Sequence, residues 1–156
     1  MRKCFSIYNE RFIVKITAII LFILYLSVLI YLTFLSQIHG RGYFHRSMNP
    51  APFRTILMFL NSGRDRAILV NIFGNIAAFL PMGLLLPLVS GKFARFLKVL
   101  LFACGLSLLV EILQYALAVG AADIDDIILN TAGGLAGYGL YVLGSLLYRR
   151  IGGSRL

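Results

Sequence analysis

The chain has 156 residues, 60% of them apolar, and its mean hydropathy is +0.88. This composition excludes an ordinary soluble globular protein, and the length allows one domain at most. A net charge of +9 would suggest a nucleic-acid partner in a soluble protein. In a membrane protein, the positions of Lys and Arg indicate instead which loops lie on the cytoplasmic side. We therefore predict an all-α, polytopic membrane protein with a single domain over residues 1–156, the lipid bilayer as its surroundings and no nucleic-acid partner.

Four apolar segments reach about 20 residues, the length that crosses a hydrocarbon core of about 30 Å. They predict membrane-spanning helices over residues 13–35, 67–89, 97–119 and 127–148. The first segment is longer than the apolar region of a signal peptide, and no small-residue cleavage motif follows it. We expect it to remain as a transmembrane helix.

The basic residues are unevenly divided between the two sides of such a bundle. The side of both termini carries ten of them, and the loop over residues 36–66 carries five. The positive-inside rule predicts cytoplasmic termini, with that loop and the acidic turn at 123–126 on the outer side.

Within the outer loop, apolar residues recur with helical spacing at Phe53, Ile56, Leu57 and Leu60. The pattern predicts a short amphipathic helix over residues 53–61. Two placements fit it equally: the helix lies in the outer membrane interface, or it closes over the bundle as a lid.

Small residues and a proline mark the packing surfaces of the second and fourth spans. Pro81 interrupts the second span and predicts a kink, because proline frees a backbone carbonyl. Gly133, Gly134, Gly137 and Gly144 form a stripe on the fourth span that predicts close approach of another helix. A packing role alone is the favoured interpretation for these glycines.

Glu111 lies inside an apolar run, where a charge costs about 3 kcal/mol near the centre of a helix. Counting about 1.5 Å per residue from the outer ends of the spans, Asn75 and Glu111 lie roughly 12 Å deep. Asn71, Gln114 and Asn130 lie at about 6 to 8 Å by the same rise. Because five polar side chains from three helices share one band, we expect them to face one polar pocket.

Glu111 has no basic residue at its own depth within a span, which leaves two states open. It is protonated and hydrogen-bonded to Asn75 or Gln114, or it is ionised and paired with an arginine of the outer loop. The candidate arginines are Arg46, Arg54, Arg64 and Arg66.

Asp123, Asp125 and Asp126 form an acidic turn between the third and fourth spans. One interpretation is a cap for the fourth helix by Asp123 or Asp125. The other is a Mg²⁺ or Ca²⁺ site, which is the weaker alternative because three carboxylates in four residues match no complete cation-binding loop. We predict no resident metal or other cofactor.

Four sequence blocks carry a family resemblance. They read RSMNPAPF at 46–53, NIAAFLPMGLLL at 75–86, EILQ at 111–114 with GAADIDD at 120–126, and NTAGGLAG at 130–137. In this order they resemble the motifs of the VanZ-like membrane proteins. The resemblance implies a small bacterial plasma-membrane protein of the cell envelope, associated with resistance to the lipidated glycopeptide antibiotic teicoplanin, and it implies no particular reaction.

The pocket and the resemblance predict the same ligand-binding positions: Arg46, Asn49, Asn71, Asn75, Glu111, Gln114, Asp123, Asp126 and Asn130. We predict that this outward-facing pocket engages an envelope lipid precursor or an amphiphilic antibiotic. Two alternatives stay open. One is an intramembrane enzyme acting on an envelope lipid, with Glu111 or Asp126 as acid or base, although an enzyme is disfavoured. The other is a proton-linked transporter or flippase that works as a homo-oligomer.

Overall fold

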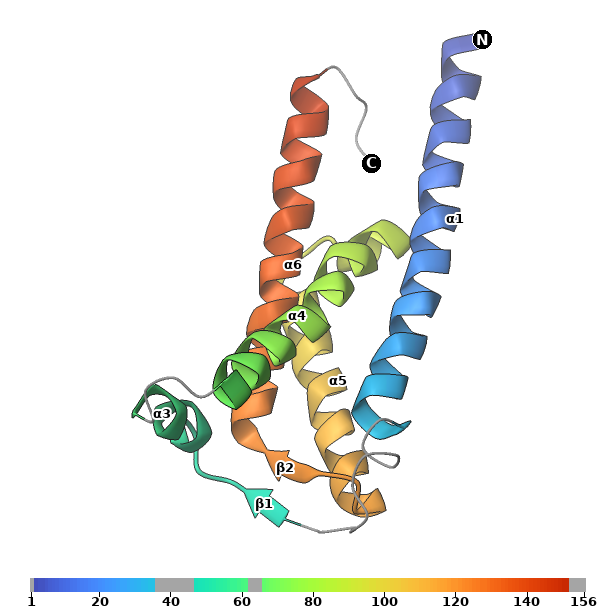
Figure 1. Cartoon of the computed structure of the whole chain (residues 1–156). Coiled ribbons are helices and arrows are strands. Elements are labelled where there is room, and N and C mark those ends of the chain that lie inside the picture. Colours follow the sequence, from blue (N-terminus) through green and yellow to red (C-terminus); the bar gives the residue numbers. More distant parts are fainter. Residues whose placement is uncertain (1, 36–46, 62–65, 152–156) are drawn as a thin grey trace.

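The computed structural model describes residues 2–35, 47–61 and 66–151 (Figure 1). In these ranges four helices are long and apolar enough to cross a membrane. They are α1 (Arg2–Ile30), which continues as the π-helical turn η1 (Tyr31–Leu35), α4 (Arg66–Val89), α5 (Phe96–Leu117) and α6 (Ile124–Arg150). The all-α class and the four predicted spans are confirmed.

Three shorter elements and a turn of 3₁₀ helix connect the spans. They are β1 (Ser47–Asn49), α3 (Arg54–Asn61), η2 (Gly91–Phe93) and β2 (Ala121–Asp123). The strands pair in parallel, with Asn49 opposite Asp123. This two-stranded sheet was not predicted, because three-residue strands carry too few residues for a period of two to be recognised.

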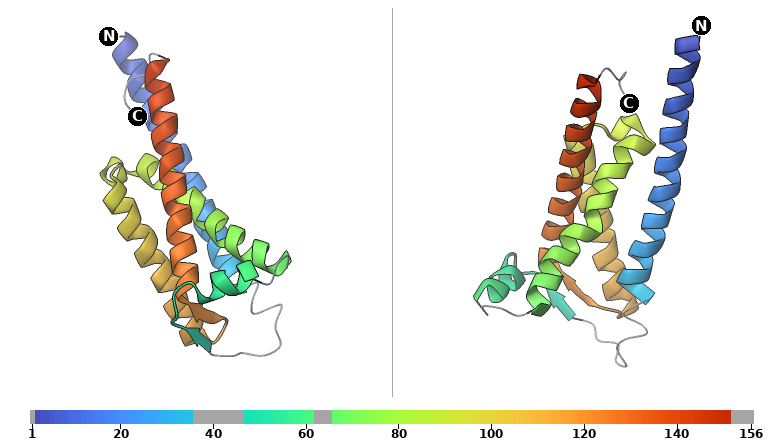
Figure 2. Two further views of the ribbon diagram at one scale, coloured as in Figure 1. Left: turned by 90° about the vertical axis from the view of Figure 1, so that its left-hand side faces the viewer. Right: turned by 45° about the horizontal axis from the view of Figure 1, so that its top comes forward.

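The spans form a bundle that is closed at one end by the sheet. The start of α1 and the end of α6 lie at one end of the molecule, and β1, β2 and α3 lie at the other (Figures 1 and 2). α4 crosses α6 obliquely, and α1 packs mainly on α4. Both termini of the bundle therefore lie on one side, as an even number of spans requires.

α3 lies at the edge of the bundle, beyond the start of α4 (Figure 1). The apolar side chains of Phe53, Leu57 and Leu60 are 53%, 54% and 67% exposed. Because the rest of the described chain does not cover this apolar face, the structure favours the interface placement of α3 over the lid.

The backbones of α4 and α6 touch at three glycines. A Cβ atom added to Gly133 would lie 2.1 Å from the carbonyl oxygen of Ile76, and one on Gly137 would lie 2.0 Å from that of Leu80. In the opposite direction, a Cβ on Gly83 would lie 1.8 Å from the oxygen of Gly134. No larger residue fits at these positions without moving backbone, which is how small residues serve membrane helices. Gly83 was missing from the predicted packing residues.

The main core cluster lies next to this contact. It contains Phe79, Met82, Leu86, Ala103 and Leu29. A Cβ on Gly134 would lie 2.9 Å from both the Met82 Cε atom and the Ala103 Cβ atom. The absence of a side chain at Gly134 therefore lets these two core residues pack against α6. α4 runs through Pro81 within this region and remains one helix.

Gly144 does not take part in the contact between α4 and α6, so its packing role stays a prediction. A Cβ added there meets no atom within 4 Å among the described residues. The reason is geometric: α6 extends past its crossing with α4, so the later part of the glycine stripe has no neighbouring helix (Figure 1).

Replacing Gly137 with alanine should destabilise the bundle. The new methyl group would collide with the Leu80 carbonyl, and forcing extra carbon into a packed contact costs about 1–3 kcal/mol. We expect a lower thermal midpoint in detergent. Gly139→Ala is the matched control, since a Cβ there meets nothing within 4 Å and alanine favours helix. Equal midpoints for the two variants would contradict the backbone contact.

Candidate functional site

The candidate site is built where α5 ends and the chain turns into β2 and α6. α5 stops at Leu117, and Ala118 adopts a left-handed conformation with φ of 57°. Its N–H bonds back to the carbonyls of Gln114 and Tyr115. This turn brings β2 alongside β1 and starts α6 directly after Asp123.

Asp123 caps α6, as one of the two sequence interpretations predicted. Its Oδ1 atom accepts the Asp125 N–H at 2.9 Å. The same carboxylate accepts the Thr55 hydroxyl at 2.5 Å and the Asn49 side-chain amide at 3.2 Å. Asp123 therefore ties the start of α6 to both β1 and α3.

Asp125 anchors α3, a role that sequence reasoning missed. Its side chain is fully buried, with 0% exposure. One carboxylate oxygen accepts the Phe53 N–H at 2.5 Å, and the other accepts those of Thr55 at 2.7 Å and Ile56 at 3.1 Å. A carboxylate at a helix N-terminus meets unpaired N–H groups and a favourable dipole. Phe53 holds φ at 62°, an uncommon conformation for a non-glycine residue that this anchor supports.

Glu111 is 4% exposed, and its Oε2 atom accepts the backbone N–H of Asp123 at 2.9 Å. Among the described residues, none of the predicted partners Asn75, Gln114, Arg54 and Arg66 bonds to Glu111. The side-chain amide of Gln114 instead donates to the Thr33 carbonyl at 3.3 Å. The turn after α5 folds the β2 backbone over Glu111, and helix depth alone could not reveal that.

Asn75 connects α4 to α6. Its Nδ2 atom donates to Asp126 Oδ1 at 2.5 Å and to Asn71 Oδ1 at 2.9 Å. The predicted polar face of α4 therefore meets the predicted polar face of α6.

Asn130 is 5% exposed and bonds to a residue that sequence reasoning did not select. Its Nδ2 atom donates to the Ser107 hydroxyl at 2.9 Å, joining α6 to α5. Its Oδ1 atom has no hydrogen-bond partner among the described residues. Ser107 carries a signal that was available, since it lies one helical turn before Glu111 on α5.

A cavity of about 610 Å³ opens between these side chains, within the size range of small-molecule sites. Seven of the nine predicted ligand-binding residues line it: Asn71, Asn75, Glu111, Gln114, Asp123, Asp126 and Asn130. Asn49 does not line it, because its amide is turned to Thr55 and Asp123. Arg46 lies outside the described residues.

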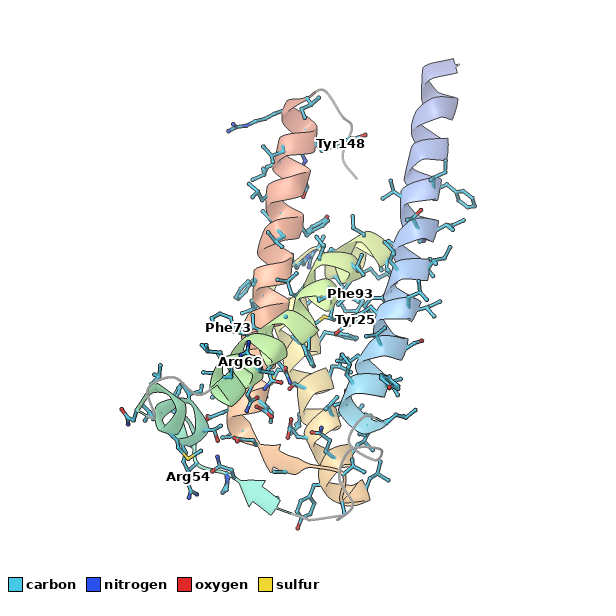
Figure 3. All side chains as sticks on the ribbon, in the orientation of Figure 1. Tyr25, Arg54, Arg66, Phe73, Phe93 and Tyr148 are labelled. Atoms are coloured by element: carbon cyan, nitrogen blue, oxygen red, sulfur yellow. The ribbon has the colours of Figure 1, made fainter. Side chains whose placement is uncertain are left out.

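No lysine or arginine of the described residues lines the cavity. Arg54 and Arg66, labelled at the sheet end of the bundle in Figure 3, are exposed and away from its lining. The other two candidate arginines, Arg46 and Arg64, lie outside the described residues. The charges on the described wall are therefore all acidic.

The three aspartates of the acidic turn point to different partners. Asp125 is occupied by backbone N–H groups of α3, Asp123 by β1 and α3, and Asp126 by Asn75. Within the described ranges, no group of three His, Cys, Asp or Glu side chains is arranged to hold a metal ion. The geometry gives the Mg²⁺ or Ca²⁺ alternative no support from these residues.

Comparison with known proteins assigns the family. The VanZ/LLP1 family model matches residues 22–147, which include every lining residue of the cavity. This chain belongs to the VanZ/LLP1 family. It is 40% identical over 102 residues to Protein VanZ of Enterococcus faecium, an alignment that covers 65% of the chain and 56% of that relative. The chain thus spans a little over half the length of its VanZ relative, and no solved structure matches it. Family membership and four apolar helices together make it a membrane protein.

The Asp125 anchor predicts that Asp125→Asn loosens α3. Three N–H groups would lose a carboxylate acceptor, and such hydrogen bonds are worth about 1.5–3 kcal/mol each. We expect amide hydrogen exchange at Thr55 and Ile56 to accelerate by about tenfold or more. Asp126→Asn is the matched control, because Asp126 bonds to Asn75 and makes none of these bonds. Unchanged exchange in Asp125→Asn would show that the carboxylate does not hold α3.

Proposed function

We propose that this VanZ/LLP1 membrane protein receives the polar head of an amphiphile or of a lipid-linked envelope component in the cavity between α4, α5 and α6. One observation carries the proposal: polar side chains from three apolar helices and one strand gather around a single cavity. Burying so many polar groups costs free energy unless they are paired or used. A bundle built only for packing would fill this volume with apolar side chains.

The cavity wall also offers room for an apolar chain. Leu29, Val70, Ala78, Phe79 and Val110 line it beside the carboxylates and amides. A mixed lining of this kind suits a molecule with a polar head and a hydrocarbon tail.

The proposal includes the location of the site. The site would lie in a bacterial plasma membrane, and the distribution of Lys and Arg supports cytoplasmic termini with the sheet end outside. The cavity would then face the outer leaflet and the envelope. The resemblance to VanZ-like proteins makes teicoplanin, which carries an acyl chain, the first amphiphile to test.

Glu111→Gln and Asp126→Asn should each weaken binding of teicoplanin to membranes that contain the protein. Each replaces a carboxyl group of the cavity wall with an amide of almost the same shape, and the loss should be about tenfold or more in affinity. Binding of labelled teicoplanin to vesicles and susceptibility of expressing cells would be measured at matched protein levels. Ser145→Ala is the control, since Ser145 lies on α6 away from the cavity lining and bonds only to its own helix. Wild-type behaviour of both cavity variants would overturn the proposal.

One observation supports a second candidate, an intramembrane enzyme acting on an envelope lipid. Glu111 and Asp126 are carboxyl groups from two helices on the wall of the same cavity, an arrangement that acid–base chemistry uses. Lipid mass spectrometry of expressing cells separates the candidates. A new lipid species that disappears in both carboxylate variants favours the enzyme, and an unchanged lipid profile with intact teicoplanin binding favours the binding protein.

A further inference from the structure

The hydrogen-bonding groups on the cavity wall are unbalanced between donors and acceptors. Three of the four side-chain amides on the wall already donate to the protein, whereas the Asn71 amide nitrogen donates to none of the described residues. Both N–H bonds of the Asn75 amide are used, by Asn71 and Asp126. The amide nitrogen of Asn130 donates to Ser107, and that of Gln114 donates to Thr33.

The acceptors, in contrast, exceed the donors that the described residues supply. Glu111, Asp123 and Asp126 line the cavity, and an ionised carboxylate has about four acceptor positions. Glu111 receives one hydrogen bond among the described residues, from the Asp123 N–H. No lysine or arginine of the described wall offsets these charges.

Asn130 gives an independent sign that a donor is missing. Its side chain is 5% exposed and lines the cavity, and its Oδ1 atom has no hydrogen-bond partner among the described residues. Buried oxygen atoms without a donor are rare in folded proteins and call for an explanation. This oxygen has almost no accessible surface, so an N–H group of a ligand would reach it only after the Asn130 side chain turned toward the cavity.

We propose that the cavity selects an amphiphile whose head is a protonated amine, and that it rejects phosphate heads. This inference rests on the proposed function, because it names the class of ligand for the same site. A primary ammonium has three donors and no acceptor, which complements the carboxylates of Glu111, Asp123 and Asp126 on the wall. A phosphate brings only acceptors and negative charge, so it would be repelled by the same wall.

The apolar part of the wall argues for an amphiphile over a small hydrated cation. The cavity of about 610 Å³ is far larger than an ammonium group, and Phe79 and Val110 contribute to its lining beside Glu111. An alkyl chain would cover this apolar surface, whereas a free cation would leave it in contact with water.

The test uses the full chain in lipid nanodiscs and four probes: n-dodecylammonium, n-dodecyl phosphate, n-dodecanol and ethylammonium. Side-chain amide NMR signals of Asn75 and Asn130 report binding at the cavity, and probe dissolved in the lipid affects wild type and variants equally. We expect saturable shifts with dodecylammonium and none with dodecyl phosphate. Glu111→Gln and Asp126→Asn should each weaken the dodecylammonium response by about tenfold or more.

Asn130→Asp is the second variant, chosen because it adds charge at the free acceptor. It should strengthen dodecylammonium binding, an effect that a merely structural role of Asn130 would not produce. Ser145→Ala should match wild type, since Ser145 does not line the cavity.

The probes separate failure of the inference from failure of the proposed function. Saturable binding of dodecyl phosphate or dodecanol in place of dodecylammonium would overturn the ammonium preference and leave an amphiphile-binding cavity. Ethylammonium binding as tightly as dodecylammonium would overturn the need for an alkyl chain. Absence of saturable shifts with all four probes would overturn both proposals.

Discussion

The direct contact between the backbones of α4 and α6 sets the geometry of everything else. Gly133 and Gly137 on α6 lie against the carbonyls of Ile76 and Leu80, which fixes the height of one helix relative to the other. Asn75 immediately precedes Ile76, and the contact therefore holds the Asn75 amide within hydrogen-bond distance of Asp126. Side chains at these crossing points would separate the helices and, with them, the two halves of the polar wall.

A second constraint holds the sheet end together: its buried acids are satisfied mainly by backbone N–H groups rather than by cations. Glu111 accepts from β2, Asp123 caps α6, and Asp125 receives the first N–H groups of α3. Such bonds strengthen as water is excluded, and they fix backbone geometry more tightly than flexible lysine or arginine partners would. These bonds join α3, the end of α5 and the start of α6 around the turn that contains β2.

Much of the site could be predicted from the sequence because helix rise converts residue number into depth. That relation placed Asn75, Glu111 and Asn130 in one band, and all three line the cavity. Depth does not give rotation about the helix axis or the path of a loop, so it did not predict that Glu111 accepts from the Asp123 N–H or that Gln114 donates to Thr33. The bonds from Asp125 to α3 join residues about 70 positions apart, and no local pattern encodes such a pairing. Spacing along a helix also cannot say where a neighbouring helix ends, which is why Gly144 has the same spacing but lies outside the contact.

The position of α3 bears on how a ligand would reach the cavity. Leu57 and Leu60 leave an apolar face exposed, while Asp125 holds the start of this helix against α6. A helix with such a face suits the boundary between head groups and acyl chains, and at that position it would set the boundary beside the sheet end of the bundle. The cavity lies at the same end, because β2 and the first turns of α6 line it. On the proposed function, an amphiphile in that leaflet would have its head at this level and would enter the cavity sideways from the lipid, without its tail crossing water.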